Sequence, residues 1–274
     1  MSTFYRILIL IALVFEQNPI IKPQNIWFEN SLQPNTSFKI SSKKETKTEL
    51  LYIMPEENLK KLKEKGVSNP TINTVKEETE IIQNIGDYVN NELHFVNTFS
   101  KVIGEQEVFS PGDQIFYSYS SDYGAKVSGT SKEAFPNQKE VFDQLTQALS
   151  KSFFRGKKMA LNDTLTIISP IQLNFGTFDM DMKIRTIYKL VKIKKSKCTF
   201  AVIQSVSASM NIENLVIKLT GKGKGWATYN PQLKRITFLD DDLEMNFSAN
   251  IDKNSRLEGK IKIHSIEKNE FVKK

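Results

Sequence analysis

The sequence has little of the residue types that most catalytic and metal sites require. Among its 274 residues there is one cysteine, Cys198, and there are two histidines, His94 and His264. A single cysteine excludes an internal disulfide framework and any metal site built from several cysteines, and two histidines nearly exclude a histidine zinc site. Cys198 begins a strand-like run over residues 198–210, which favours a buried, unreactive thiol.

Arginine is scarce as well. Only five of the 38 basic residues are Arg, although the net charge is +7. Nucleic-acid interfaces depend on arginine, and no nucleic-acid-binding motif accompanies the charge, so the sequence predicts no nucleic-acid partner. The densest basic stretch, residues 183–197, could contact anionic lipid or a polyanion. The interpretation that the pattern favours is a strand whose lysines face solvent or protect a sheet edge.

Recognisable catalytic motifs are missing too. No Gly-x-Ser-x-Gly elbow is present, and a Ser-His-Asp triad would have to use His94 or His264, which stand in polar, strand-like contexts. No carboxylate pair stands out for glycosidase chemistry. The sequence therefore predicts no catalytic, cofactor-binding or metal-binding residue, and it leaves the ligand-binding residues unassigned.

Two short runs contain the residue types of known ion-binding loops. The run 221–225 (GKGKG) lacks the glycine spacing of a phosphate-binding loop, and we interpret it as a flexible or bulged strand end. The run 240–242 (DDD) lacks the ligand pattern of a calcium-binding loop. We interpret it as a charged turn between a strand ending at Leu239 and another starting at Leu243.

Long hydrophobic runs are absent apart from one at the amino terminus. Arg6 precedes nine apolar residues, 7–15, and polar residues follow. This order is that of a secretory signal peptide, whereas a bilayer span needs about 20 apolar residues. No clear cleavage site follows the run, and the alternative interpretation is a buried amino-terminal strand.

We therefore expect residues 1–17 to be a signal peptide, residues 18–30 a linker, and residues 31–274 a single β-rich domain. The expected location is extracytoplasmic, either periplasmic or secreted. No transmembrane segment is expected after signal removal.

The dominant pattern of the remaining chain is alternation of apolar and polar residues. It is strictest over residues 243–251, where Leu, Met, Phe, Ala and Ile alternate with Glu, Asn, Ser and Asn. Such a period of two indicates a half-exposed antiparallel strand. Further strands are expected around 36–40, 49–53, 115–119 and 198–210. Turns are expected at 229–232 and 252–255, and turns or bulges at 85–87 and 103–105.

Two helices are expected among these strands. Pro55, two glutamates, four lysines and Gly66 predict a short surface helix. Residues 137–153 have a capping-box start and apolar residues on one helical face, which predicts an amphipathic helix packed on the sheet. The expected fold is β-rich α+β: a large curved antiparallel sheet, a meander or half-barrel, with one packed and one surface helix.

Residues 110–268 resemble a family of bacterial envelope proteins that is known as a domain of unknown function. The similarity lies in the order of segments: the helix 137–153, a short strand with Pro170, then 188–190, 200–203, the glycine-containing strand–turn–strand 221–236 and the long strand 243–251. The resemblance implies a curved sheet similar to the half-barrels of periplasmic lipoprotein carriers. It implies no catalytic residues, and this chain lacks the lipidated cysteine of some members.

Three functions are compatible with these patterns. The favoured one is a non-enzymatic binding module whose curved sheet shelters an apolar or lipid-like ligand, because long alternating strands and one covering helix can leave a cavity. The alternative is a structural or protein-interaction component of the cell envelope that uses the lysine-rich surface or a strand edge. The third is an extracellular hydrolase, which requires a cleft with convergent ionisable groups. The oligomeric state stays open.

Overall fold

The computed structural model describes residues 25–104, 109–120, 124–131, 146, 154–174, 179–194, 196–212, 215–250 and 252–272. The predicted signal peptide (1–17), residues 18–24 of the predicted linker and, apart from Thr146, the predicted helix 137–153 lie outside these ranges. Thr146 is helical, and its hydroxyl accepts a hydrogen bond from the Val127 N–H at 3.1 Å.

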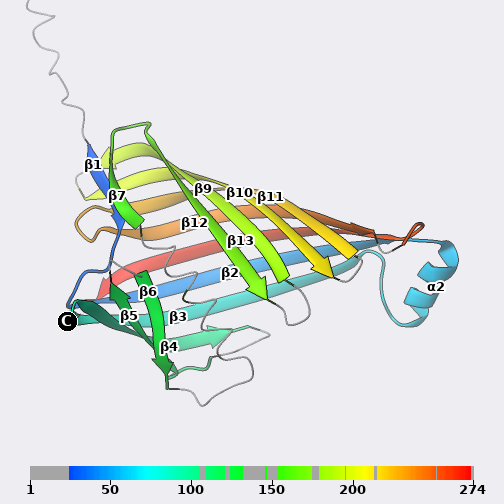
Figure 1. Cartoon of the computed structure of the whole chain (residues 1–274), viewed down its shortest axis with the longest axis horizontal. Helices are drawn as coiled ribbons and strands as arrows, with labels where there is room; N and C mark the ends of the chain where they lie inside the picture. The colour runs from blue at the N-terminus through cyan, green and yellow to red at the C-terminus, as the bar shows by residue number, and fades with distance from the viewer. Residues whose placement is uncertain are drawn as a thin grey trace, which may run out of the picture.

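One open antiparallel sheet of 11 strands forms the body of the molecule (Figure 1). The strand order is β6-β5-β4-β3-β2-β13-β12-β11-β10-β9-β8. The predicted large curved antiparallel sheet is confirmed. The bounds of the strands are β2 (Thr36–Ile53), β3 (Thr71–Val89), β4 (Glu92–Ile103), β5 (Gln114–Ser120), β6 (Gly124–Thr130), β8 (Thr164–Asn174), β9 (Asp179–Lys194), β10 (Lys197–Ile212), β11 (Leu215–Asn230), β12 (Arg235–Asn250) and β13 (Arg256–Val272).

The sheet consists of two meanders that meet at its centre. Strands β2 to β6 follow one another on one side, and β8 to β13 follow one another on the other side. The meanders are joined because β2 pairs with β13, from Ser37 opposite Val272 to Ile53 opposite Arg256. Segments that are far apart in the sequence are thereby placed side by side.

Strand β2 runs through a polar stretch that lies between the two strand segments expected from the sequence. Residues 41–48 (SSKKETKT) pair with β3 on one side and with β13 on the other. Ion pairs join the neighbours: Lys43 lies 2.9 Å from Glu78, and Lys76 lies 3.3 Å from Glu45. Cross-strand pairing, and not a local hydrophobic pattern, makes these residues a strand.

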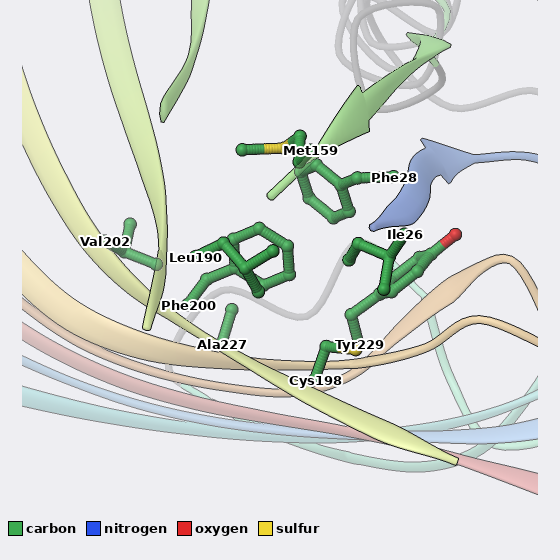
Figure 2. Packing of buried hydrophobic residues seen from close by; sticks show 9 residues of the cluster. All are labelled: Ile26, Phe28, Met159, Leu190, Cys198, Phe200, Val202, Ala227 and Tyr229. Atoms are coloured by element: carbon green, nitrogen blue, oxygen red, sulfur yellow. The ribbon is translucent and has the colours of Figure 1, made fainter. Parts of the chain in front are cut away.

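A two-stranded ribbon, β1 (Ile26–Asn30) with β7 (Phe154–Met159), packs on one end of the sheet. The predicted linker is therefore wrong over residues 26–30. The physical reason is Phe28, which is fully buried, stacks on Phe200 at 4.2 Å and meets Tyr229 edge-on at 4.9 Å. Figure 2 shows the cluster around it: Ile26, Phe28, Met159, Leu190, Cys198, Phe200, Val202, Ala227 and Tyr229.

A second buried cluster lies at the same end of the strands. It consists of Leu32, Phe38, Ile85, Leu93, Phe95, Phe109, Ile115 and Tyr117. Arg235 connects this cluster to β12 and β13: its guanidinium donates to the Gln83 side chain at 2.7 Å and to the Asn269 side chain at 3.2 Å, and it lies 4.3 Å from the Phe38 ring centroid. Burial lowers the pKa of Arg235 to about 10. The core thus occupies one end of the sheet.

Helix α2 (Glu56–Glu64) joins β2 to β3 at the opposite end (Figure 1) and confirms the predicted surface helix. None of its residues is buried. Gly66 has a φ of 79°, its N–H donates to the Lys63 carbonyl at 2.9 Å, and the Val67 N–H donates to the Leu62 carbonyl at 3.0 Å. These two bonds form the glycine C-cap that the sequence predicts. In the described ranges, no helix combines the length and apolar character needed to cross a membrane.

Turns and bulges follow local chemistry. The pairing of β3 with β4 shifts between Ile85 and Tyr88, which confirms the bulge expected around Gly86. The turn that closes this hairpin was not predicted. It consists of Asn90 and Asn91, whose φ values of 52° and 64° suit a two-residue hairpin turn.

Candidate functional site

The sheet has two chemically different faces. Residues that pair directly across strands share a face, and so do residues two apart on a strand. The row Glu45, His264, Asp242 and Lys224 defines what we call the charged face. The adjacent row Thr46, Ile263, Leu243 and Gly223 defines the opposite, apolar face, which also carries the β1–β7 ribbon.

The glycine and aspartate runs lie inside strands, so both sequence interpretations are wrong. Residues 221–225 are central in β11, paired with β10 and β12, and are not a strand end. Residues 240–242 are inside β12 and are not a turn. Neighbouring strands explain both. Atoms of β12 occupy the space beside the glycines, the Met245 side chain at Gly221 and main-chain oxygens at Gly223 and Gly225, and the aspartates are paired with β11 and β13.

Alternation distributes the three aspartates between the faces. Asp241 is buried on the apolar face and accepts a hydrogen bond from the Ser265 hydroxyl. Burial raises its pKa above the ordinary value. Asp240 and Asp242 are on the charged face, where His264 Nδ1 lies 3.9 Å and 3.0 Å from their carboxylates.

A depression of about 530 Å³ lies on the charged face. It brings together residues from sequence runs that were interpreted separately: Lys222 and Lys224 of the glycine run, Asp242 of the aspartate run, and His264. We call it the charged depression. Its lining is Glu45, Lys47, Lys222, Gly223, Lys224, Asp242, Leu243, Glu244, Lys262, Ile263 and His264.

The chemistry of the charged depression is electrostatic. Glu244 lies 2.7 Å from Lys260 and 3.9 Å from Lys262, and the hydrogen bond from Lys260 lowers the Glu244 pKa. Its described lining residues include no serine, threonine or cysteine, so they provide no hydroxyl or thiol nucleophile. The arrangement is suited to pairing strands and attracting ions.

Ion pairs between neighbouring strands continue on this face towards β3 and β4. A second depression of about 340 Å³ shares Glu45 and His264 with the first. Beside it, Glu78 accepts from Lys43 at 2.9 Å and from Lys101 at 2.7 Å. Hydrogen bonds from Lys101 and Lys43 lower the Glu78 pKa to about 2. Because these side chains come from three strands, no local pattern in the sequence predicts the cluster.

The apolar face continues beyond the buried clusters. Leu243, Met245 and Phe247 on β12 are half-buried and alternate with exposed polar residues, as predicted. A side chain at position 259 would overlap the Phe247 ring, so that ring lies over Gly259. The described elements that pack on this face, β1 and β7, lie at the end opposite α2 (Figure 1).

The other residues discussed in the sequence analysis lie outside the charged depression. Cys198 is fully buried beside Phe200, and burial raises its pKa, which fits the predicted unreactive thiol. His94 is exposed on β4, opposite Ser118. The basic residues between 183 and 194 lie on β9 with their side chains in solvent, as favoured. They do not protect an edge, because β8 is outside β9.

Fold and faces together define a β-rich protein with an open sheet that is charged on one side and apolar on the other. No family model and no curated protein matches the sequence. Among solved structures, one described as "Asymmetric conductivity of engineered proteins" is similar, with 8% identity, 82% of this chain and 99% of that chain covered, and a TM-score of 0.26. Two substituted forms of the Rh. blastica porin match at 8% and 6% identity over 84% of this chain and 99% of theirs, with TM-scores of 0.25 and 0.26. Similarities at this level carry no argument, so function is inferred from this chain's own residues.

Proposed function

We propose that this chain is a non-enzymatic binding module of the bacterial envelope, and that its apolar face holds an apolar or lipid-like ligand. The observation that carries the proposal is the half-buried row Leu243, Met245 and Phe247, which extends past the end covered by β1 and β7. The amphipathic helix predicted over residues 137–153 is the expected cover.

Apolar burial supplies the energy for such binding. Burying about 300 Å² of apolar surface contributes about 7.5 kcal/mol at about 25 cal/mol per Å², before the cost of association is subtracted. The resemblance to envelope proteins supports the location. The charged depression, by contrast, provides no apolar surface of this extent. Its carboxylates Asp242 and Glu244 are paired with His264 and Lys262, so we rank a hydrolase below the binding module.

Native mass spectrometry of the gently purified chain tests the proposal, together with binding of cis-parinaric acid as a fluorescent probe. The informative variant is Met245→Lys, because lysine keeps the linear shape of methionine while placing a charge on the apolar face. We expect the affinity for the probe to fall about tenfold, since burying that charge or losing apolar contact costs at least about 1–2 kcal/mol.

Asn246→Lys is the matched control. It introduces the same charge one position along β12, but on the charged face, where Asn246 is exposed. We expect this variant to bind the probe like the original protein. Equal affinity of both variants and an absence of co-purified lipid would refute the apolar-ligand proposal.

The second candidate is an interaction component of the envelope, and the open sheet favours it. Strands β6 and β8 are its outer strands, and outer strands can pair with a strand of another chain. Affinity purification from native envelopes distinguishes the two functions. Recovery of a protein partner without lipid supports this candidate, and lipid without a protein partner supports the first.

A further inference from the structure

Strands β8 to β11 present a distinct part of the charged face. Across this part, Lys189 lies opposite Ala201, which lies opposite Trp226, and Arg185 lies opposite Ser205, which lies opposite Lys222. Positions 183, 185, 187 and 189 of β9 share this face. Neither these residues nor their partners on β10 and β11 include Asp or Glu. The mixed ion pairs begin only at β12.

The basic side chains here are exposed. They come from β9 and β11, and within the described ranges no ion pair holds any of them. They are Lys183, Arg185, Lys189, Lys222 and Lys224. Two of them, Lys222 and Lys224, also line the charged depression at the border with β12.

Large apolar side chains stand among these charges. Trp226 is 55% exposed, Ile203 is 53% exposed and Ile168 is 51% exposed. Their strand partners place all three on the same face as the lysines: Ile203 lies opposite Lys224, and Ile168 lies opposite Arg185. Large apolar residues that stand singly on a surface are ordinary, but these three lie on one face among cations, which is the composition of an interaction patch.

We propose that this basic patch, formed by the five cations with Trp226, Ile203 and Ile168, docks on the surface of an anionic lipid bilayer. The cations attract anionic headgroups, and a tryptophan ring is well suited to the boundary between headgroups and acyl chains. A soluble polyanion would engage the cations but leave the isoleucines without a partner. The patch lies on the face opposite the proposed ligand site, so the two inferences depend on different residues.

Sedimentation with vesicles tests the docking. The vesicles contain either equal parts of phosphatidylglycerol and phosphatidylcholine, or phosphatidylcholine alone. In a Trp27→Phe background Trp226 is the sole tryptophan, because the sequence has two. We expect binding to the anionic vesicles only, weakened by salt, with a blue shift of Trp226 emission as its ring leaves water.

Arg185→Glu with Lys189→Glu should reduce vesicle binding at least about tenfold, since each cation near an anionic surface adds to the attraction. The matched control is Lys60→Glu with Lys63→Glu, which makes the same change in net charge on the exposed helix α2 and should leave binding unchanged. Met245→Lys should also bind vesicles normally, which separates this test from that of the proposed ligand site.

Three results would overturn the proposal: no binding to anionic vesicles, equal loss in both charge-reversal variants, or displacement by dextran sulfate with no shift of Trp226 emission. The last result would identify the patch as a site for soluble polyanions. Circular dichroism of each variant, compared with the original protein, establishes that a loss of binding is not a loss of fold.

Discussion

Among single residues, Tyr229 contributes most visibly to attaching the β1–β7 ribbon to the sheet. Its ring belongs to the buried cluster, while its hydroxyl donates to the Trp27 carbonyl at 3.0 Å and accepts from the Glu29 N–H at 3.3 Å. Burial raises the Tyr229 pKa to about 12, so the hydroxyl can still donate a hydrogen bond at a pH near the ordinary tyrosine pKa of about 10. One side chain thus supplies both apolar contact and hydrogen bonds to β1.

Tyr229→Phe is expected to lower the free energy of unfolding by about 1–2 kcal/mol, because two main-chain groups of β1 lose their partner while the ring remains. Urea denaturation measures the change. Tyr88→Phe, which alters an exposed tyrosine, is the control and should be nearly neutral. Equal effects of the two substitutions would contradict the anchoring role of the Tyr229 hydroxyl.

Glu78 predicts a specific acid sensitivity. Its pKa is lowered from 4.5 to about 2 by hydrogen bonds from Lys101 and Lys43. Between these pH values the unfolded chain binds more protons at this position than the folded chain does. The contribution of Glu78 to the free energy of unfolding is therefore present above pH 4.5 and is lost as the pH falls towards 2. Glu78→Gln should therefore flatten the pH dependence of the unfolding free energy in this window.

The control for Glu78 is Glu56→Gln, which removes an exposed carboxylate from α2. Urea titrations across the acid range compare both variants with the original protein. If the Glu56 substitution flattens the curve as much as the Glu78 substitution does, the lysine contacts of Glu78 are not the cause. High salt should reduce the difference, because the pairs are near the surface.

At the scale of elements, glycines in β11 and β13 allow β12 to pack closely against both neighbours. A side chain at Gly259 would overlap the Phe247 ring, and one at Gly225 would overlap the main-chain oxygen of Asp240. The first obstacle is a side chain that can move. The second is backbone that is paired within the sheet and cannot move without breaking the strand pairing.

This difference predicts two outcomes for alanine substitutions. Gly259→Ala should destabilise the protein by about 1–3 kcal/mol, and Phe247→Leu should recover part of that loss in the double variant. Gly225→Ala should cost more and should not respond to Phe247→Leu. A double-mutant cycle measured by urea denaturation gives the coupling. Absence of coupling between positions 247 and 259 would show that their contact is unimportant.

The same elements show what a local pattern can and cannot predict. Alternation over residues 243–249 predicted the orientation of Leu243, Met245 and Phe247, because one strand's own residues determine it. The glycine run 221–225 was predicted to be a strand end and the aspartate run 240–242 a turn, because both runs consist of residues that favour turns. No residue nearby in the sequence indicates that a strand continues through them. Their pairing partners on β10, β12 and β13 supply that signal.

Across the whole molecule, buried residues are distributed unevenly along the strands. Both clusters lie at the end where β1 and β7 pack, while α2 at the other end contributes no buried residue. Main-chain pairing nevertheless extends along the full length of β12. Stability along one strand should therefore follow the side-chain packing and not the number of backbone bonds.

Hydrogen exchange tests this expectation. Amides of β12 at 236–239 should be protected more strongly than those at 245–249, by at least about 1 kcal/mol in opening free energy, because only the former adjoin the clusters. Exchange followed by mass spectrometry of overlapping peptides has the required resolution. Uniform protection along β12 would mean that the sheet opens as one unit and would contradict the expectation.

The sequence by itself determined the class of fold, the bulge at Gly86 and the capped helix α2, since each depends on residues within a few positions of one another. Only the tertiary structure decided that β2 pairs with β13, that residues 26–30 complete a core, and that Lys222, Asp242 and His264 share one depression. The register between distant strands decides which side chains meet. That register depends on many weak contacts made together across the sheet, and no single segment carries the information.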